Sequence, residues 1–369
     1  MFGDGMKEVM FLGLGRVGFK SLLLFKELIR DSYIYAVDKD PFIGSRVKEL
    51  EGVEFHVFND EVVEGLARRV DLVVTALPSS IAYSIIKRLI NKCVDVVDVS
   101  FFLEDPYSLE NIVEGCSSVF VPDAGFAPGY SNVVVGSIFN KLKDVEEIDI
   151  MVGGIPVEPI PPLGYVVTWN PSDLIEEYVR PARIIENGVL KYVDPFDYVI
   201  EVSLDNLGVL EGFVSDGLRT LIRNIRVKNM REITLRWPSH IKAMKLLRDL
   251  GLMSKDLIKV GEVEIRPSEL LARLFEAKLS RRIDDIAITY IVATSSGGKK
   301  YSELSILYGS PESPATSTFT ALIHAYTAKL AYELELPAGI QPLENLSMFK
   351  ESYDAYLRSK GVIIKTDKL

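Results

Sequence analysis

Cysteine and histidine are scarce in this chain. Among 369 residues there are two cysteines, Cys93 and Cys116, and three histidines, His56, His240 and His324. Two cysteines are too few for a disulfide framework or a cysteine-bound zinc site, and the histidines stand far apart in the sequence. We therefore expect no metal centre.

Long uncharged apolar runs and dense basic runs are also missing. No stretch reaches the roughly eighteen apolar residues that a membrane helix needs, and the first residues, MFGDGMKEV, lack the basic and apolar regions of a signal peptide. The formal net charge is −10, whereas binding to a nucleic-acid backbone requires a basic surface. These absences predict a cytoplasmic protein with no nucleic-acid and no membrane partner.

The overall composition is that of a globular protein. Apolar residues make up 48% of the chain and charged residues 25%, which is an ordinary balance for a folded domain. The length suits two domains, or one domain with a large insertion. No internal repeat is present.

The first third of the chain alternates short β-branched runs with amphipathic stretches. The expected strands are EVMFLGLG, YIYAVDKD, VEFHVFND, VDLVVTALP, VDVVDVS and SSVFVPDAG, and two expected helices between them are VGFKSLLLFKELIRD and SIAYSIIKRLINK. Strands that alternate with helices predict an α/β fold with a parallel, doubly wound sheet of the Rossmann type.

The middle third has a different character. Longer alternating strands such as DYVIEVSL and REITLRW are joined by Gly/Pro-rich connections such as GGIPVEPIPPLGY, which favours an inserted α/β domain built on an open mixed sheet. The later stretch TFTALIHAYTAKLAYEL predicts a long helix that needs a core to cover. The predicted domains are a dinucleotide-binding domain at 1–128, a substrate and dimerisation domain at 129–324, and a segment at 325–369 that returns to the first domain.

A glycine-rich turn follows the first expected strand. VMFLGLGRVG has the spacing G-x-G-x-x-G between a strand and a helix, which is the context in which this motif binds a dinucleotide. Gly13 allows a tight turn, Gly15 lets the backbone approach the pyrophosphate, and Gly18 lets helix and strand pack closely. Arg16 and Val17 begin the helix whose amides would point at the phosphates.

Further residues fit a cofactor site. Asp38 ends the second expected strand about twenty residues after the glycines, where a carboxylate accepts hydrogen bonds from the ribose hydroxyls and disfavours the 2′-phosphate of NADP. The sequence therefore favours NAD, although the neighbouring Lys39 could soften that preference. Pro78 and Ser79 follow the fourth strand and are candidates to line the nicotinamide side. Alternatively, Asp38 only caps a turn, and Ser79 or Ser80 is a helix N-cap.

The turn VPDAGFAPGYSN lies where the character of the chain changes. In a two-domain dehydrogenase this position forms the floor of the active site. Asp123, at a strand end, is a candidate to hold a substrate ammonium group. The alternative is a crossing loop with a solvated carboxylate.

Two later blocks, EGFVSDGLRTL and MREITLRWPSH, carry the remaining candidate residues. Their polar side chains include Ser215, Asp216, Arg219, Glu232, Arg236 and His240. Arg219 or Arg236 could clamp a substrate carboxylate, because the arginine fork matches a carboxylate bidentately. Ion pairs of these arginines with Asp216 and Glu232 are the alternative. His240 is a candidate general base, or else a capping or packing residue.

Several blocks together resemble the saccharopine dehydrogenase-like family in order and spacing, most closely its lysine 6-dehydrogenase branch. They are GLGRVG, DAGFAPG, VGGIP, PLGYVVTWNPSDLIEEYVRPARIIENG, EGFVSDGLRTL, MREITLRWPSHIKAMKLLRDLG and GIQPLENL. The resemblance covers nearly the whole chain. It implies a Rossmann domain, an inserted substrate domain, and oxidation of a carbon–nitrogen bond with a nicotinamide cofactor, typically in a homodimer.

Two positions depart from the pattern of that branch. Val214 stands where a tyrosine is usual, and Ser239 where a glycine is usual. Both fall at the presumed substrate pocket. The resemblance implies NAD-dependent deamination of the L-lysine side chain, with Asp123 or His240 as base. Alternatives are a saccharopine-type enzyme for a secondary amine and a non-enzymatic NAD-binding regulator. A semialdehyde dehydrogenase would need an activated thiol, and Cys116 has no histidine near it in the sequence.

Overall fold

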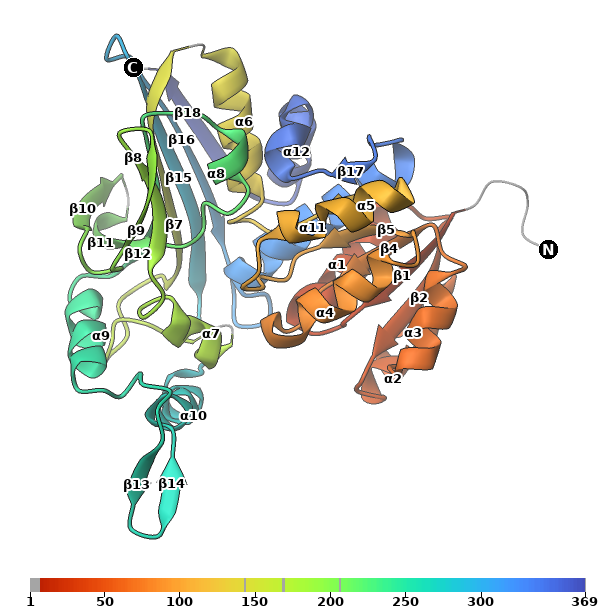
Figure 1. The fold of residues 1–369 in the computed structure, drawn as a ribbon, viewed down its shortest axis with the longest axis horizontal. Coiled ribbons are helices and arrows are strands. Elements are labelled where there is room, and N and C mark those ends of the chain that lie inside the picture. The colour runs from red at the N-terminus through yellow and green to blue at the C-terminus, as the bar shows by residue number, and fades with distance from the viewer. Residues whose placement is uncertain (1–6, 143, 168–169, 206, 369) are drawn as a thin grey trace. The chain divides into compact units, whose positions relative to one another are not determined.

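The structure is a computed structural model that describes residues 7–142, 144–167, 170–205 and 207–368. The chain divides into two compact units (Figure 1). Residues 1–136 and 317–355 form the parallel-sheet unit, and residues 137–316 and 356–369 form the mixed-sheet unit. The chain therefore passes three times from one unit to the other.

The parallel-sheet unit contains a seven-stranded sheet in the order β17-β6-β5-β4-β1-β2-β3. Its strands are β1 (Glu8–Leu12), β2 (Tyr33–Asp38), β3 (Val53–Val57), β4 (Leu72–Thr75), β5 (Asp95–Asp98), β6 (Val119–Val121) and β17 (Gly339–Ile340). All neighbouring strands pair in parallel. The strand order reverses direction between β1 and β4, as in a doubly wound dinucleotide-binding sheet, and confirms the predicted fold class.

Helices follow these strands along the chain. They are α1 (Arg16–Leu28), α2 (Phe42–Val47), α3 (Asp60–Ala67), α4 (Ser79–Ile90), the 3-10 helix η1 (Pro106–Leu109), α5 (Glu110–Cys116) and η2 (Leu343–Phe349). Strand β1 is buried almost completely, with Val9 and Met10 at 0% exposure. Such continuous apolar strands form in parallel sheets because helices cover both faces.

The mixed-sheet unit has a nine-stranded sheet. The main path runs β10-β11-β12-β7-β15-β16-β18, and β8 pairs with β12 and with β9. The strands are β7 (Val145–Pro156), β8 (Ala182–Glu186), β9 (Val189–Val193), β10 (Val199–Leu204), β11 (Gly208–Ser215), β12 (Asn229–Arg236), β15 (Asp285–Ser295), β16 (Lys300–Tyr308) and β18 (Ile363–Lys368). Strands β12 and β7 are parallel and their neighbours are antiparallel, which confirms a mixed sheet.

The helices of this unit are short except for one. They are α7 (Pro171–Glu176), α8 (Leu221–Asn224), α9 (His240–Asp249) and α10 (Pro267–Leu279), and a small hairpin of β13 (Ile258–Val260) and β14 (Val263–Ile265) precedes α10. Three further helices, α6 (Tyr130–Lys141), α11 (Ala315–Glu333) and α12 (Lys350–Ser359), contain the three points at which the chain changes unit.

The unit boundaries differ from the predicted domain boundaries. The first unit extends to residue 136 and takes back the chain from residue 317, earlier than the predicted 325. In α11, His324 lies 3.1 Å from the hydroxyl of Ser21 in α1. The prediction that all of 325–369 returns to the first domain is wrong for residues 356–369, because β18 pairs with β16 of the mixed sheet.

Cys93 and Cys116 form a disulfide, with their Cα atoms 4.9 Å apart. Cys93 precedes β5 and Cys116 precedes β6, and these two strands are neighbours in the sheet. The turns that lead into adjacent parallel strands lie side by side, which brings the two sulfurs together. The sequence, with too few cysteines for a framework, did not reveal this single bond.

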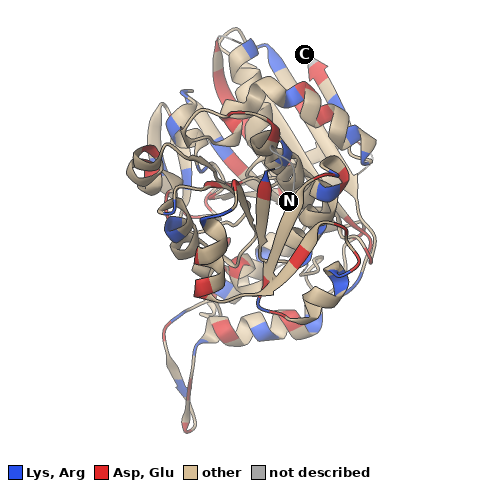
Figure 2. Cartoon of the chain, turned by 90° about the vertical axis from the view of Figure 1, so that its right-hand side faces the viewer, with Lys and Arg blue, Asp and Glu red and all other residues tan. Residues whose placement is uncertain are grey.

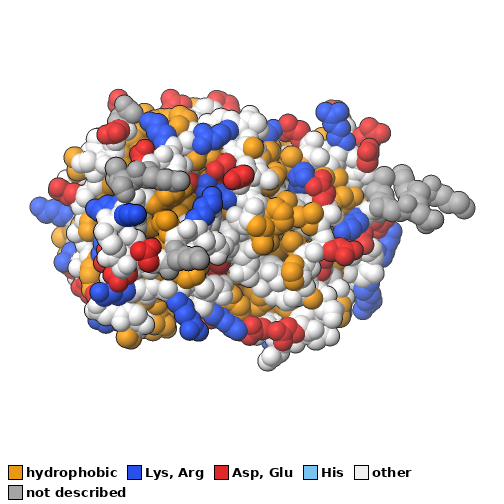
Figure 3. Space-filling view, turned by 90° about the horizontal axis from the view of Figure 1, so that it is seen from above, with side chains coloured by type: hydrophobic (Ala, Val, Ile, Leu, Met, Phe, Trp, Pro, Cys, Tyr) orange, Lys and Arg blue, Asp and Glu red, His pale blue; other side chains and the backbone are white. Residues whose placement is uncertain are grey.

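Charged side chains of both signs are interleaved along the chain and over the face drawn in Figure 3 (Figures 2 and 3). In the described part of the chain, no helix is long and apolar enough to cross a membrane. The same residues contain no group of three or more His, Cys, Asp or Glu side chains placed to hold a metal ion.

Candidate functional site

The glycine turn lies between β1 and α1. Gly13 has a φ of 89°, and its amide donates to the carbonyl of Val37 at 2.9 Å. A Cβ at Gly13 would overlap the carbonyl oxygen of Ala76, and a Cβ at Gly18 would overlap the carbonyl oxygen of Gly13. Both positions therefore require glycine, and the close approach of turn, helix and strand depends on them.

Gly15 has the opposite environment. A Cβ at this position would meet no atom within 4 Å. Gly15 is the N-cap of α1, whose first turn has no acidic side chain, and no side chain bonds to the cap. Arg16 is exposed and Val17 half-buried at the start of the same helix. The amides and dipole of this helix end suit an anion, so the turn fits the pyrophosphate of a dinucleotide.

Asp38 connects the end of β2 to the glycine turn. One carboxylate oxygen accepts from the amide of Leu14 at 2.5 Å, and the other accepts from the amide of Asp40 at 2.9 Å. Asp38 is half-buried and Lys39 is exposed. A carboxylate has about four acceptor positions, so Asp38 can organise the loop and still bind two ribose hydroxyls.

The loop after β4 is also held by hydrogen bonds. Pro78 is exposed and occupies the N-cap of α4, where no side chain caps the helix. The alternative that Ser79 or Ser80 is the N-cap is therefore wrong, because both lie within the first helical turn. The amide of Leu77 donates to the hydroxyl of Ser100 at 2.9 Å, which ties this loop to the loop after β5.

Asp98, which the sequence analysis missed, lies at the centre of this arrangement. One of its oxygens accepts from the hydroxyls of Thr75 at 2.6 Å and Ser100 at 2.7 Å, and the other accepts from the amide of Ser100 at 3.0 Å. Burial raises the pKa of Asp98 to about 7, and the nearby Asp123 adds to the rise. Thr75 and Asp98 end two adjacent buried strands and pair in register, which brings their side chains together.

Asp123 follows β6 and is 4% exposed. Its φ is 54°, and its carbonyl accepts from the amide of Gly125 at 2.8 Å. Gly129 has a φ of 137°, and a Cβ there would overlap the backbone of Gly125. This tight turn places a second buried carboxyl group near Asp98, at the carboxyl ends of β5 and β6.

Ser215 lies among buried polar groups of the mixed-sheet unit. It stands opposite Glu232 in the pairing of β11 with β12. Its hydroxyl donates to the Glu232 carboxylate at 3.1 Å and accepts from the hydroxyl of Thr234 at 2.8 Å. A Cβ at Gly217 would overlap the Glu232 carboxylate. Glu232 therefore packs against the turn that leads to Arg219.

Arg236 is buried, with 3% exposure, and all its guanidinium nitrogens have partners in the protein. Nη2 donates to Glu177 at 2.7 Å, Nε to the hydroxyl of Tyr178 at 3.3 Å, and Nη1 to the carbonyl of Leu235 at 3.0 Å. The guanidinium also lies over the ring of Tyr165, with Cζ 4.7 Å from the ring centre. This environment supports a role in the core more than a role as substrate clamp.

The alternative that Arg219 or Arg236 forms an ion pair with Asp216 is wrong. Asp216 instead forms a bidentate pair with Arg183, at 2.6 and 3.1 Å. Arg219 is 4% exposed and has a φ of 47° in the turn between β11 and α8. For Arg219, the role of substrate clamp and the alternative of an ion pair with Glu232 both stay predictions.

His240 begins α9 and is 1% exposed. Its Nδ1 lies 2.9 Å from the carbonyl oxygen of Leu163, to which it must donate, and its Nε2 lies 2.8 Å from the hydroxyl of Tyr178. Burial, helped by the positive charge of Arg236, lowers the pKa of His240 to about 3. A neutral imidazole with both nitrogens engaged supports the packing interpretation.

The structure thus groups the predicted residues into separate sets. Arg236 and His240 share Tyr178 as a partner, and Ser215 lies with Glu232. Asp123 belongs to the parallel-sheet unit, together with the glycine turn and Asp38.

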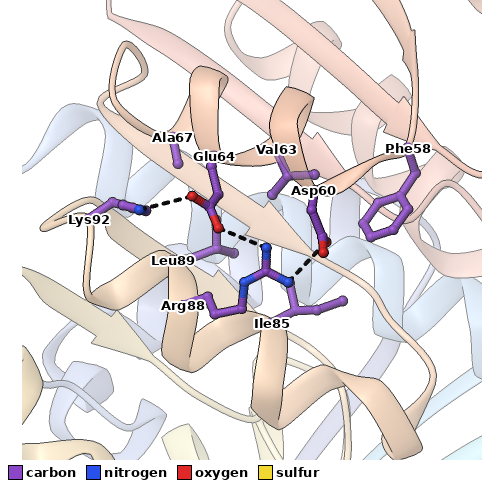
Figure 4. A pocket seen from close by; sticks show the side chains of 9 residues that line it. All are labelled: Phe58, Asp60, Val63, Glu64, Ala67, Ile85, Arg88, Leu89 and Lys92. Carbon is purple, nitrogen blue, oxygen red and sulfur yellow. Dashed lines mark hydrogen bonds and ion pairs between the residues drawn. The ribbon is translucent and has the colours of Figure 1, made fainter.

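A small pocket lies between α3 and α4 (Figure 4). Arg88 donates to Asp60 at 2.9 Å and to Glu64 at 2.8 Å, and Lys92 pairs with Glu64 at 3.1 Å. Each of these charges already faces a charge of opposite sign. These ion pairs therefore hold the two helices together, and the pocket offers no group for catalysis.

The fold and the glycine turn define the class, an α/β protein with a dinucleotide-binding sheet and a second unit built on a mixed sheet. Residues 125–360 match the family model described as saccharopine dehydrogenase C-terminal domain. This match covers more than half of the chain, so the chain belongs to the saccharopine dehydrogenase family, and the resemblance to this family is confirmed.

Curated relatives include the mitochondrial alpha-aminoadipic semialdehyde synthase of Bos taurus, 25% identical over 314 residues, which are 75% of this chain and 32% of that protein. The alpha-aminoadipic semialdehyde synthase of Arabidopsis thaliana is 24% identical over 154 residues, 40% of this chain and 14% of that protein. The chain thus spans a third or less of the length of these relatives.

A solved structure has a similar fold. It is the apo saccharopine dehydrogenase (L-Glu forming) of Saccharomyces cerevisiae, with a TM-score of 0.79 and 14% sequence identity. The similarity covers 98% of this chain and 100% of that chain. At this identity the likeness shows that both chains share the fold.

Proposed function

We propose that this chain is a nicotinamide-dependent oxidoreductase that acts on a carbon–nitrogen bond of an amino acid. Its family membership and the glycine turn support this proposal. Gly13, Gly15 and Gly18 would hold the pyrophosphate, and Asp38 would accept from the ribose hydroxyls and favour NAD over NADP. A bound nicotinamide would supply the hydride acceptor.

The substrate amine must lose a proton before hydride can leave the adjacent carbon. A primary amine has a pKa of about 10.4 in water and is mostly protonated at neutral pH. Asp123 is the proposed group that attracts the ammonium and receives its proton, directly or through water. His240 is less suited, because its two nitrogens are engaged and its pKa is about 3.

L-Lysine is the leading substrate in this proposal, oxidised at its side-chain amine to the 6-semialdehyde and ammonia after hydrolysis of the imine. The observation that carries this choice is that Arg236 forms an ion pair with Glu177 and Arg183 forms an ion pair with Asp216. Saccharopine carries several carboxylates and needs several clamps, whereas lysine carries one. Arg219 is the proposed clamp for it.

Saccharopine remains the second candidate substrate. The description of the family model and the name of the yeast structure favour it. In that reaction the enzyme would oxidise a secondary amine and release no ammonia.

The test is an assay of the purified chain with NAD and L-lysine at pH about 9–10, where the free amine is well populated. We expect equal amounts of NADH and ammonia, and higher activity at alkaline pH than at neutral pH. NADH from saccharopine without ammonia would replace lysine by the second candidate. If lysine, saccharopine and related diamines all fail to produce NADH, the amine dehydrogenase proposal is wrong.

A matched pair of variants tests the clamp. Arg219→Ala should cost roughly 2–5 kcal/mol of substrate binding, because it leaves the partner carboxylate unpaired. Arg226→Ala removes an exposed arginine from the same region and should leave KM for lysine unchanged. NAD affinity should stay the same in both variants. Equal KM values in the two variants would remove Arg219 from the substrate site.

A further inference from the structure

Asp98 is a buried carboxyl group that the proposed reaction does not use. It ends β5 and is 0% exposed. Its two oxygens accept from the hydroxyls of Thr75 and Ser100 and from the amide of Ser100. A buried carboxyl group is costly unless hydrogen bonds satisfy it, and a satisfied buried polar network fixes the geometry of the segments that it joins.

The segments that Asp98 joins are the loops after three adjacent strands, β4, β5 and β6. Thr75 ends β4, and Ser100 lies in the loop after β5. The Ser100 hydroxyl also accepts from the amide of Leu77 at 2.9 Å, which holds the loop after β4. The carbonyl oxygen of Asp98 accepts from the amide of Ala124 at 2.7 Å, in the turn after β6. These loops lie at the carboxyl ends of parallel strands, where open α/β sheets bind their ligands.

The strand order places the loop after β4 on the nicotinamide side of the proposed cofactor site. In the order β5-β4-β1-β2, the glycine turn after β1 lies between Asp38, which ends β2, and the loop after β4. A Cβ at Gly13 would lie 2.4 Å from the carbonyl oxygen of Ala76, so this loop lies directly against the glycine turn. With the adenosine ribose at Asp38 and the pyrophosphate at the turn, the other half of the dinucleotide reaches toward β4 and β5.

We propose that Asp98 is a positioning residue for the nicotinamide half of the cofactor. It acts through Ser100, which holds Leu77 and with it the loop of residues 76–78 beside the nicotinamide ring. Because Asp98 is fully buried, it does not itself touch the cofactor. This inference rests on the proposed function for the cofactor, but it does not depend on which amine is oxidised.

Asp95, at the other end of β5, provides a matched control. Its side chain accepts from the amide of Val119 at 2.8 Å and so joins the start of β5 to the start of β6. It lies at the amino end of the strand, opposite to the end at which the cofactor would bind. A change at Asp95 therefore removes a carboxylate hydrogen bond from the same strand but leaves the loops at its carboxyl end in place.

The test is the fluorescence lifetime of NADH bound to the full-length chain, together with the affinity for ADP-ribose measured by titration calorimetry. A reduced nicotinamide ring that a protein holds in place has a longer lifetime than the free ring, and ADP-ribose lacks this ring. Asp98→Ala should remove most of the gain in lifetime that the wild type gives, and should leave the Kd for ADP-ribose unchanged. Asp95→Ala should leave both quantities at their wild-type values.

The same variants have an expected effect on turnover. In the lysine assay, Asp98→Ala should lower kcat by roughly 10- to 100-fold, because a small misplacement of the ring slows hydride transfer by about this factor. Asp95→Ala should keep the wild-type kcat. The lifetime of bound NADH needs no substrate, so it decides the role of Asp98 even if the amine is wrongly identified.

Two further variants separate positioning from a failure to fold. Asp98→Asn keeps the side-chain volume, and its amide can bond to both Thr75 and Ser100, so it should restore most of the gain in lifetime. Ser100→Ala keeps Asp98 but removes the bond to Leu77, so it should shorten the lifetime even if Asp98→Ala does not fold. Circular dichroism and thermal unfolding establish which variants are folded.

Three results would overturn the proposal: equal lifetimes in folded Asp98→Ala and Asp95→Ala, a wild-type lifetime in Ser100→Ala, or a wild type in which bound NADH has the lifetime of free NADH. A wild type that binds neither NADH nor ADP-ribose would overturn the cofactor site itself. If the lifetimes follow the expected pattern but no amine is oxidised, the proposed reaction is wrong and the role of Asp98 stands.

Discussion

The buried imidazole of His240 should make the mixed-sheet unit sensitive to mild acid. Burial lowers the pKa of His240 to about 3 in the folded protein, whereas an unfolded chain has a histidine pKa of about 6.5. Between these values the unfolded state binds a proton that the folded state does not. The contribution of the neutral His240 to the free energy of unfolding is therefore fully present above about pH 6.5 and is lost progressively as the pH falls.

The magnitude follows from the two pKa values. At pH 5 nearly every unfolded chain is protonated at this site, and protonation favours unfolding by about 2 kcal/mol more than at pH 7. Urea unfolding at pH 5, 6 and 7, followed by tryptophan fluorescence, measures this loss. His240→Gln should be less stable than the wild type at pH 7, but its stability should fall by about 2 kcal/mol less on going to pH 5.

Other groups titrate in the same range, so the decisive quantity is the difference between variant and wild type in the free energy of unfolding lost between pH 7 and pH 5. Tyr178→Phe is the control, because it removes the hydroxyl beside Nε2 but leaves the imidazole buried. It should keep the wild-type dependence on pH. If His240→Gln and the wild type lose the same free energy between pH 7 and 5, the imidazole is protonated in the folded state and the reasoning is wrong.

Three further predictions concern the parallel-sheet unit. Asp38→Ser should weaken NAD binding and raise the ratio of NADP to NAD affinity, measured by titration calorimetry; an unchanged ratio would contradict the role of the carboxylate. Cys93→Ser should lower the free energy of unfolding by about 3 kcal/mol in denaturant titrations, because the disulfide with Cys116 closes a loop of 23 residues. Burial raises the pKa of Asp98 to about 7, above its value in the unfolded chain, so the folded state binds a proton that the unfolded state has lost. As the pH rises from about 4 to 7, the wild type should therefore lose free energy of unfolding relative to Asp98→Asn. Parallel pH profiles of the two proteins would refute this.

The parallel sheet was predictable because its signals are local. The apolar strands, the helices between them and the spacing of Gly13, Gly15 and Gly18 lie within short windows. The mixed sheet was predictable as a class from longer alternating runs. Its last strand was not, because β18 pairs with β16 some sixty residues earlier, and no local pattern specifies that partner.

In the candidate site, too, local sequence patterns predicted some features, whereas others depend on distant residues. Residue types predicted Arg236 and His240 as functional groups, but their roles depend on Tyr178 and Glu177, which lie about sixty residues away and meet them only in the folded core. Asp98 was missed because an aspartate that ends a strand is common, and only its burial between Thr75 and Ser100 distinguishes it.

The threefold passage of the chain between its units has a consequence for the order of folding during synthesis. The parallel sheet lacks its strand β17 until residues 339–340 have been made, and the mixed sheet lacks β18 until residues 363–368 follow. Neither sheet can be completed while the ribosome is still translating residues 145–308, which contain β7 to β16. Domains usually fold one after another as they emerge. Here each sheet keeps an open edge until a strand far downstream of its other strands has been made, β17 for the parallel sheet and β18 for the mixed sheet.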